Sequence, residues 1–394
     1  MNKTIKLAVA GAVLSAASMA NAGIIIPAGE WTMDINGNVN AYATFQDHDT
    51  EGTVTGGLMG AYGTGTGSAT EDSNQSINTG LLPAWLGFTG TTRQNDLDVS
   101  FTISFQPNVS DNGATGDSKT PLNRQAFLTF GDASWGSVKL GKDIGIFASD
   151  AILNDMTLLG VGGGFNNSGV STTTGGIGTG YIYAAWKGQI AYTTPDMNGF
   201  QATIGITNPN QIDTDLGGTT NRQDRYGIEA KAHYAFPMGK VWASTASYEV
   251  DGNVAFDVQV QDIGATLNFG NAALTGYYYS GEGGGNGVLG YNGASATGAE
   301  RDSDGGYVQA TYVIPSGTKL GLSYGVTRLD HADATDAAAA TTLVEEQNRW
   351  TVGAYHPLTK HLNLVAEYNS IEEKSHAGVA NDANALSLGA ILFF

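Results

Sequence analysis

The residues that could carry acid–base or metal chemistry are spread thinly along this chain. The six histidines are His48, His233, His331, His356, His361 and His376. None of them has the H-E-x-x-H spacing that binds zinc, and no glycine run is followed by the lysine of a phosphate-binding loop. A G-x-S-x-G nucleophile elbow is also absent from the sequence. We therefore expect no enzymatic activity, no metal and no cofactor.

Carboxylates are numerous, and polar side chains gather in one long connection. The chain carries 37 Asp and Glu against 18 Lys and Arg, for a formal net charge of −19. This balance excludes nucleic-acid binding, which requires a basic surface. The longest polar connection, residues 143–186, contains Asp143, Asp150, Asn154 and Asp155 near its start. These side chains either cap turns and bind backbone amides or face a solute, depending on the elements that position them.

The clearest of those elements is residues 30–46, EWTMDINGNVNAYATFQ. Its odd positions, from Trp31 to Phe45, are apolar or small, and its even positions are polar apart from Tyr42. Strict alternation predicts a β-strand with two different faces. Strands in soluble proteins mostly run about five or six residues, so this one is roughly three times the usual length.

The same alternation recurs in residues 96–106, 225–234 and 319–326, and less regularly elsewhere. The connections alternate strictly between two kinds. Seven are short and carry turn residues. Eight are long and polar, and they are residues 47–75, 107–120, 143–186, 208–221, 251–256, 281–304, 330–346 and 372–382. Fifteen connections join sixteen strands, and short turns at one end with long loops at the other are typical of a transmembrane β-barrel.

A bilayer explains the long strands. A tilted strand needs about 9–11 residues to cross it, and the sheet must close because no backbone group can stay unpaired in lipid. We expect the apolar face to contact hydrocarbon and the polar face to line a water-filled interior. Trp31, Trp135 and Trp242 stand at or beside short turns, where an aromatic girdle would lie at the membrane interface.

The first 22 residues are interpreted as a secretory signal peptide. Lys3 and Lys6 precede a short run of small and apolar residues, and Ala20-Asn21-Ala22 forms an A-x-A cleavage site. The run is shorter than the ~20 residues of a transmembrane helix. We expect the mature chain to begin at Gly23 and residues 23–394 to form one β-barrel domain.

Three blocks of sequence resemble the Gram-negative outer-membrane general porin family. The chain ends in ALSLGAILFF, an alternating strand closed by Phe394, which is similar to the family's barrel-assembly signal. Residues 122–162 resemble its strand 4, turn, strand 5 and the start of loop 3. Residues 190–206, IAYTTPDMNGFQATIGI, resemble its strand 6, turn and strand 7.

The resemblance implies an all-β protein, a sixteen-stranded trimeric barrel in the outer membrane of a Gram-negative bacterium, through which ions and small hydrophilic solutes diffuse passively. It also implies that loop 3 folds into the lumen. Selectivity in such pores comes from charge and diameter, so we assign the constriction to Asp143, Asp150, Asn154 and Asp155. Lipid and lipopolysaccharide are the implied partners, with divalent cations at the acidic loops as one means of bridging.

The sequence departs from the family at the pore wall. General porins set basic residues opposite an acidic loop 3, but the first three strands offer no Lys or Arg inward. The inward-facing residues that we expect there are Asp34, Asn36, Asn38, Asn40 and Asp98. The remaining candidate wall bases are Arg124, Lys139 and Lys142. We therefore hypothesise an acidic, cation-preferring pore. The alternatives are a substrate-selective channel with a luminal binding site and, in another class, an outer-membrane enzyme or adhesin built on the barrel.

Overall fold

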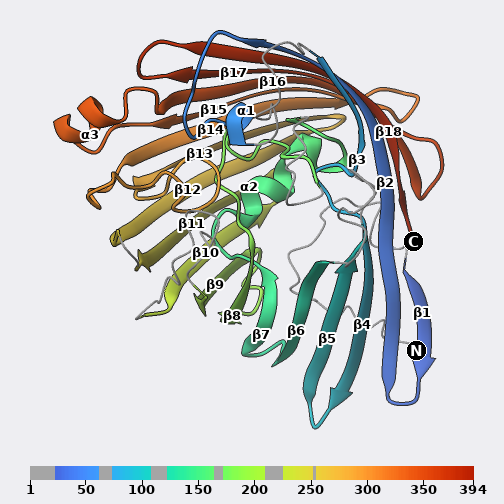
Figure 1. Cartoon of the computed structure of the whole chain (residues 1–394). Helices are drawn as coiled ribbons and strands as arrows, with labels where there is room; N and C mark the ends of the chain where they lie inside the picture. The colour runs from blue at the N-terminus through green and yellow to red at the C-terminus, as the bar shows by residue number, and fades with distance from the viewer. Residues whose placement is uncertain (1–22, 62–72, 108–121, 164–171, 209–224, 252–253) are drawn as a thin grey trace.

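The computed structural model describes residues 23–61, 73–107, 122–163, 172–208, 225–251 and 254–394. The proposed signal peptide, residues 1–22, lies outside them. Strands dominate the described chain (Figure 1). Their bounds are β1 Ile24–Ala28, β2 Trp31–Thr50, β3 Ser73–Asn78, β4 Trp85–Gln94, β5 Leu97–Gln106, β6 Leu122–Asp132, β7 Gly136–Ile144, β8 Trp186–Thr193, β9 Phe200–Thr207, β10 Gly227–Phe236, β11 Gly239–Val250, β12 Phe256–Phe269, β13 Ala272–Glu282, β14 Asp302–Val313, β15 Lys319–Leu329, β16 Val344–Pro357, β17 Leu362–Ser375 and β18 Ala380–Phe393.

Sixteen of these strands close into one antiparallel barrel. β2 is followed around the ring by β4 and then by β5 to β18 in chain order, and β18 pairs back with β2. The two remaining strands extend the wall on either side of β2. β1 pairs with the first residues of β2, Trp31–Ile35. β3 pairs with Tyr42–Asp47 of β2, further along the strand than the residues that pair with β4. The predicted closed β-barrel of sixteen strands is confirmed.

The alternation in β2 separates two environments, as expected. Val39 and Phe45 on one face are 52% and 46% exposed, whereas Asn38 and Asn40 on the other are buried inside the barrel. The same parity separates the three consecutive tyrosines of β13. Tyr278 is 51% exposed on the outer wall, and Tyr277 and Tyr279 are buried inside. The outer wall is therefore apolar, and much of the inner wall is polar.

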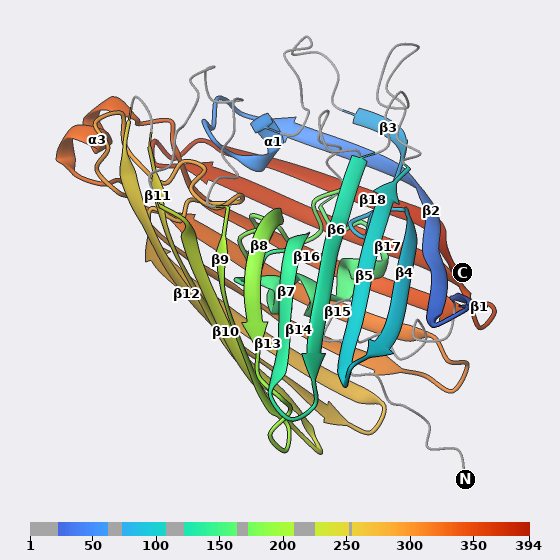
Figure 2. The ribbon, with the colours of Figure 1, turned by 90° about the horizontal axis from the view of Figure 1, so that it is seen from below.

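Short turns lie at one end of the barrel and the longer connections at the other (Figure 2). The β4–β5 turn is only Asn95 and Asp96, both with positive φ, which suits a tight hairpin. At the opposite end, the expected long connection 372–382 is wrong in extent. β17 and β18 continue to Ser375 and from Ala380, so the turn is residues 376–379. The strands there extend past the apolar belt, so polar residues on their outer face do not mark a loop.

The described parts of the connections contain four short helical elements: α1 Leu58–Ala61, α2 Ser149–Asn154, the 3₁₀ helix η2 Met156–Leu159 and α3 Ala334–Ala339. In the described part of the chain, no helix is both long and apolar enough to cross a membrane.

Part of the barrel interior is an aromatic core. Trp242, Tyr248, Tyr277, Tyr279 and Tyr307 on β11, β13 and β14 form one buried cluster with apolar residues of the 145–185 segment. On the β11–β14 side the interior is therefore packed and not water-filled as expected, because the inserted segment brings its own apolar side chains. Trp242 is 3% exposed within this cluster and does not belong to an outer girdle.

Candidate functional site

Residues 145–163 and 172–185, the described parts of the connection between β7 and β8, run inside the ring of strands, and α2 lies near the middle of the ring (Figure 1). They are called the inserted segment below. Hydrogen bonds attach this segment to strands all around the barrel. At one end, Glu229 on β10 accepts from the backbone N–H groups of Ile146 and Phe147 through a single oxygen, Oε2, at 2.5 and 2.8 Å. Its other oxygen accepts from Lys187 at 2.6 Å. Because Glu229 is fully buried, this charge-assisted network fixes where the segment leaves the wall.

A second carboxylate holds the segment on the far side of its helices. Oε2 of Glu367 on β17 accepts from the backbone N–H groups of Val161 and Gly162 at 2.9 and 2.8 Å. Its Oε1 accepts from the hydroxyl of Tyr355 at 2.6 Å. Both glutamates thus use one oxygen for two successive backbone donors, and together they pin the part of the segment that contains α2 and η2 on either side of those helices.

Neutral groups fix the helices between the two glutamates. Gln309 on β14 accepts from the N–H of Met156 and donates to the carbonyl of Asn154, at 2.9 and 2.7 Å. The hydroxyl of Tyr307 donates to the carbonyl of Ala151 at 2.9 Å. On β2, the hydroxyl of Tyr42 donates to the carbonyl of Leu159 at 2.7 Å. The helices therefore cross the lumen in a defined position.

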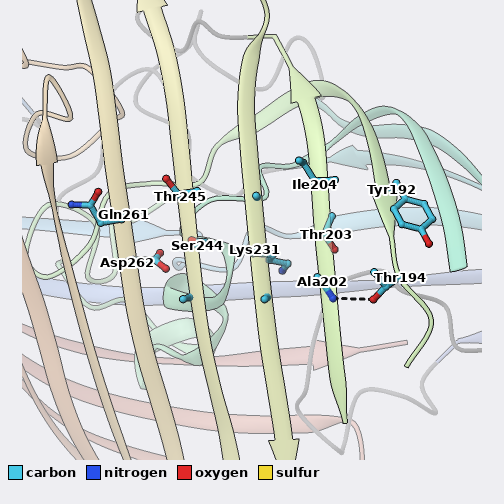
Figure 3. Close-up of a pocket in the computed structure, with 13 residues that line it drawn as sticks. Tyr192, Thr194, Ala202, Thr203, Ile204, Lys231, Ser244, Thr245, Gln261 and Asp262 are labelled. Atoms are coloured by element: carbon cyan, nitrogen blue, oxygen red, sulfur yellow. Dashed lines mark hydrogen bonds between the residues drawn. The ribbon is translucent and has the colours of Figure 1, made fainter. Parts of the chain in front are cut away.

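Asp150 on α2 is shared by two lysines. Lys231 on β10 lies 3.1 Å from Oδ2, and Lys240 on β11 lies 2.5 Å from Oδ1. Burial favours the protonated acid, but the two ammonium groups outweigh it and lower the pKa of Asp150 to about 2. Lys231, Ser244 and Asp262 project from three neighbouring strands beside α2 (Figure 3). Asp150 thus shares its one negative charge between two ammonium groups, and the carboxyl of Asp262 lies on the next strand.

Asp155 joins the helices to the β16 wall. Its Oδ1 caps η2 by accepting from the N–H of Thr157 at 2.9 Å, and its Oδ2 accepts from the hydroxyl of Tyr181 at 2.9 Å. The guanidinium of Arg349 lies 3.8 Å from the same Oδ2. Asn154, the fourth expected constriction residue, donates to the carbonyl of Asp150 at 2.7 Å. Asp155 therefore both caps a turn and balances a buried arginine.

Asp143 lies at the end of β7, before the inserted segment. Its carboxylate forms an ion pair with Lys139 and accepts from Gln125 at 3.0 Å. Arg124 on β6 is buried, bonded to Gln106 and donating to the hydroxyl of Tyr183 at 3.0 Å. Asp143, Asp150 and Asp155 therefore do not share a basic partner: Asp143 pairs with Lys139, and the other two acids pair with residues of other strands.

Lys142 is the one expected wall residue that the structure places elsewhere. It shares its face of β7 with Leu140, whose neighbours Leu128 and Ile190 are exposed on the outer wall. Its ammonium donates to the carbonyl of Asn123 at 3.0 Å at the strand end. The assignment of Lys142 to the pore wall is therefore wrong, since successive residues of a strand point to opposite faces.

The expected polar residues of the first strands do face inward. Asn38 and Asn40 are buried and donate to the carbonyls of Pro83 and Leu82 at 2.9 and 3.0 Å. Asn36 accepts from the indole of Trp85 at 3.3 Å. Asp34 lies nearer the short-turn end, opposite Thr89 of β4. Asp98 lies at that rim, paired with Arg93 at 2.8 Å.

Phe394 closes the ring at the C-terminus. Its backbone exchanges two hydrogen bonds with Gly37 of β2, at 2.9 and 3.1 Å. The last residue thus joins the end of β18 to the first strand of the barrel. Its role as an assembly signal remains a sequence-based expectation.

Several basic residues of the interior were missed. They are Lys187, Lys231, Lys240, Lys319 and Arg349, on β8, β10, β11, β15 and β16. The alternation already separates Lys231 and His233 from the apolar residues of their strand, so parity alone could have assigned them to the lumen. The pairing of Lys231 with Asp150 depends on the path of the inserted segment, which no local pattern encodes.

The wall beside this cluster also contains a hollow of about 520 Å³ (Figure 3). Its outer side is lined by small side chains, Ala202, Ala230, Ala232 and Ala243, with Tyr192 and Ile204 at its edge. In the described residues no group of three or more His, Asp or Glu side chains has a metal-binding arrangement.

Solved outer-membrane proteins share this architecture. The outer membrane channel DcaP of Acinetobacter baumannii is 16% identical, with a TM-score of 0.68 over 95% of this chain and 100% of DcaP. OmpF of Salmonella typhi, solved in complex with daunomycin, is 16% identical, with a TM-score of 0.60 over 94% of this chain and 100% of OmpF. OmpT of Vibrio cholerae is 16% identical, with a TM-score of 0.59 over 94% and 100% of the two chains.

These likenesses show the fold. No curated protein matches the chain significantly. The family model described as Gram-negative porin matches residues 7–376, nearly the whole chain. Together with a closed barrel that has a segment inside it, this match confirms the resemblance drawn from the sequence: the chain belongs to the Gram-negative porin family of outer-membrane channels.

Proposed function

We propose that this protein is a passive-diffusion porin for ions and small hydrophilic solutes, with a preference for cations. The observation that carries the proposal is the inserted segment, which narrows a barrel whose remaining inner wall is polar. Thr89, Thr102, Thr129 and Gln125 on β4 to β6 are half-buried on the inner wall, and so form a hydrophilic surface across from the aromatic core.

The constriction lies where this wall faces α2 and η2. Asp150, Asn154 and Asp155 supply its loop side, and Asp143 with Lys139 and Arg124 supplies the adjoining wall. Asp143 and Asp155 each have one basic neighbour and Asp150 has two, so these carboxylates give the narrow part of the pore no net negative charge. A strong preference for cations therefore has to arise elsewhere along the axis.

The long-loop end of β11 to β18 provides such a charge. In the described part of this region the bases are Arg301, Arg328 and Lys374. The acids far outnumber them and are Glu249, Asp251, Asp257, Glu282, Glu300, Asp302, Asp304, Asp330, Asp333, Asp336, Glu345, Glu346, Glu372, Glu373 and Asp382. A mouth of one charge sign concentrates ions of the other. We propose that this acidic rim, more than the constriction, gives a moderate cation preference.

The apolar outer wall fits membrane lipid, and the acidic rim fits lipopolysaccharide bridged by divalent cations. A homotrimer is the proposed assembly, and a trimer form of the similarly folded OmpT of Vibrio cholerae, 15% identical with a TM-score of 0.57, supports it.

Planar-bilayer recording of the purified protein tests the proposal. We expect ohmic single channels, conductance steps in threes for a trimer, and a reversal potential of cation sign in a KCl gradient. That preference should weaken in high salt, where exposed charges are screened. Anion preference, or the absence of channels from correctly folded protein, would contradict it.

A substrate-selective channel is the second candidate. The aromatic core and the inserted segment leave less open cross-section than a uniformly hydrated barrel, which favours solutes that fit one shape. Saturable block of the ionic current by a solute at low concentration would support this reading over simple diffusion.

A further inference from the structure

Two histidines from different connections are stacked at the long-loop end. His331 lies in the connection that contains α3, and His376 lies in the β17–β18 turn. Their ring centroids are 3.8 Å apart, and the planes are inclined by 27°. Stacking at this distance is favourable for neutral rings and unfavourable for two imidazolium ions, because like charges repel.

The hydrogen bonds of the pair differ between the two rings. Nε2 of His376 lies 2.9 Å from the carbonyl oxygen of Leu329. A carbonyl only accepts, so Nε2 carries the proton. Nδ1 of His331 is buried without a hydrogen-bond partner among the described residues. It lies 3.7 Å from Oδ2 of Asp336.

The charged groups around the pair come from three elements. Asp336 on α3 is bound in a bidentate manner by Arg301, with both N···O distances 2.7 Å, so its charge is already balanced. Burial, His376 and Arg301 lower the pKa of His331, opposed by Asp336 and Asp330. The folded arrangement therefore favours the neutral imidazole.

The stacked histidines join the 330–343 connection to the β17–β18 turn. These two segments in turn contact residues 51–61, which follow β2. The N–H of His376 donates to the carbonyl of Leu343 at 2.9 Å. The residues on either side of Leu343 bind Thr55. The N–H of Thr55 donates to the carbonyl of Thr342 at 2.7 Å, and the N–H of Val344 donates to the carbonyl of Thr55 at 3.0 Å. A small apolar cluster of Val54, Leu329, Leu343 and Val344 fills the space beside the pair.

After Thr55, the chain turns into the barrel mouth, where α1 begins at Leu58. The N–H of Leu58 donates to Gln347 at 2.7 Å, and that of Met59 donates to Glu373 at 3.0 Å. Both acceptors are buried side chains of the inner wall. The seating of α1 in the mouth therefore depends on the same strands that the histidine pair holds together.

We propose that His331 and His376 form an acid-sensitive clasp that keeps residues 51–61 seated in the channel mouth. At neutral pH the two rings are stacked, and the lowered pKa of His331 keeps its imidazole neutral. In acid, protonation of His331 places a cation against the ring of His376 and beside Arg301, which opposes the stack. The 330–343 connection then separates from the 376–379 turn, and α1 loses its support.

His331→Phe tests the clasp, because phenylalanine keeps the stack and cannot be protonated, and the replaced Nδ1 makes no hydrogen bond. The first measurement is hydrogen–deuterium exchange of residues 330–343 and 51–61 in the folded full-length protein at pH 7.5 and pH 5. Wild type and variant should match at pH 7.5. At pH 5 these residues should exchange roughly two- to fivefold faster in the wild type than in His331→Phe. That is the range that charge interactions near a surface produce.

The second measurement is current noise, with acid added only to the compartment facing the long loops. Noise should rise in the wild type and stay constant in His331→Phe. His48→Gln, which changes another histidine near the same end, should respond like the wild type. Only the noise readout depends on the proposed channel function, so exchange tests the clasp independently. Equal exchange of wild type and His331→Phe at pH 5 would overturn it.

Discussion

Glu229 on β10 and Glu367 on β17 hold the inserted segment in the same way, one before α2 and the other after η2. In each, one carboxylate oxygen accepts from two successive backbone N–H groups, and the other oxygen binds a buried side chain. That side chain is Lys187 for Glu229 and Tyr355 for Glu367. The segment is thus fixed by inward-facing acids of the wall, and the channel depends on their being intact.

Glu229→Gln should destabilise the barrel strongly. It leaves the ammonium of Lys187, which is 3% exposed, without its carboxylate. Breaking one partner of a buried ion pair typically costs about 3–5 kcal/mol. Denaturant unfolding of the protein in detergent measures the change. Glu249→Gln, in an exposed pair with Arg225, should change the stability little.

The double variant Lys187→Met with Glu229→Gln separates charge from shape. Since it removes the uncompensated lysine, it should recover a large part of the stability lost by Glu229→Gln alone. If both variants were equally unstable, the ion pair would not be the cause.

Removing the two lysines beside Asp150 should raise the cation preference. Lys231→Gln with Lys240→Gln removes two positive charges beside α2. Burial then raises the pKa of Asp150, but loss of part of its one negative charge offsets only part of this change. The reversal potential in a KCl gradient should shift toward the cation potential. Lys142→Gln is the matched control, because Lys142 lies on the outer face. An equal shift in both variants would show that the position of the charge does not matter.

The charge of Asp150 should persist far into the acid range. Lys231 and Lys240 overcome the effect of burial and lower the pKa of Asp150 to about 2, against an ordinary value of 3.8. A lowered pKa stabilises the folded protein fully above 3.8, and this contribution disappears as the pH falls toward 2. The stability difference between wild type and Asp150→Asn should therefore be constant from pH 7 to 5 and shrink below about pH 4. Unfolding curves at several pH values measure it, and a decline already near pH 6 would contradict it.

The alternation of apolar and polar residues predicted the barrel well, because it identifies the two faces of each strand without knowledge of the strand's partners. The alternation in β2 and the two kinds of connection were enough for the ring of sixteen strands. The site was harder, because the partners of Asp150 and Asp155 are far from them in sequence. Arg349, for example, meets Asp155 only because the inserted segment crosses the lumen to β16. Lys142 was misassigned because a lysine at a strand end can reach water from either face.

Gly325 on β15 provides a test of how closely the inserted segment approaches the wall. A Cβ at this position would lie 2.1 Å from the backbone carbonyl oxygen of Thr179. That oxygen belongs to a buried turn and cannot move without displacing the segment. Gly325→Ala should therefore destabilise the protein by about 1–3 kcal/mol, the usual cost of overpacking, and should change the single-channel conductance. Gly276→Ala on β13 is the matched control, since nothing lies within 4 Å of the added carbon. Thermal unfolding and bilayer recording measure the two effects, and unchanged conductance in Gly325→Ala would show that this part of the segment does not shape the pore.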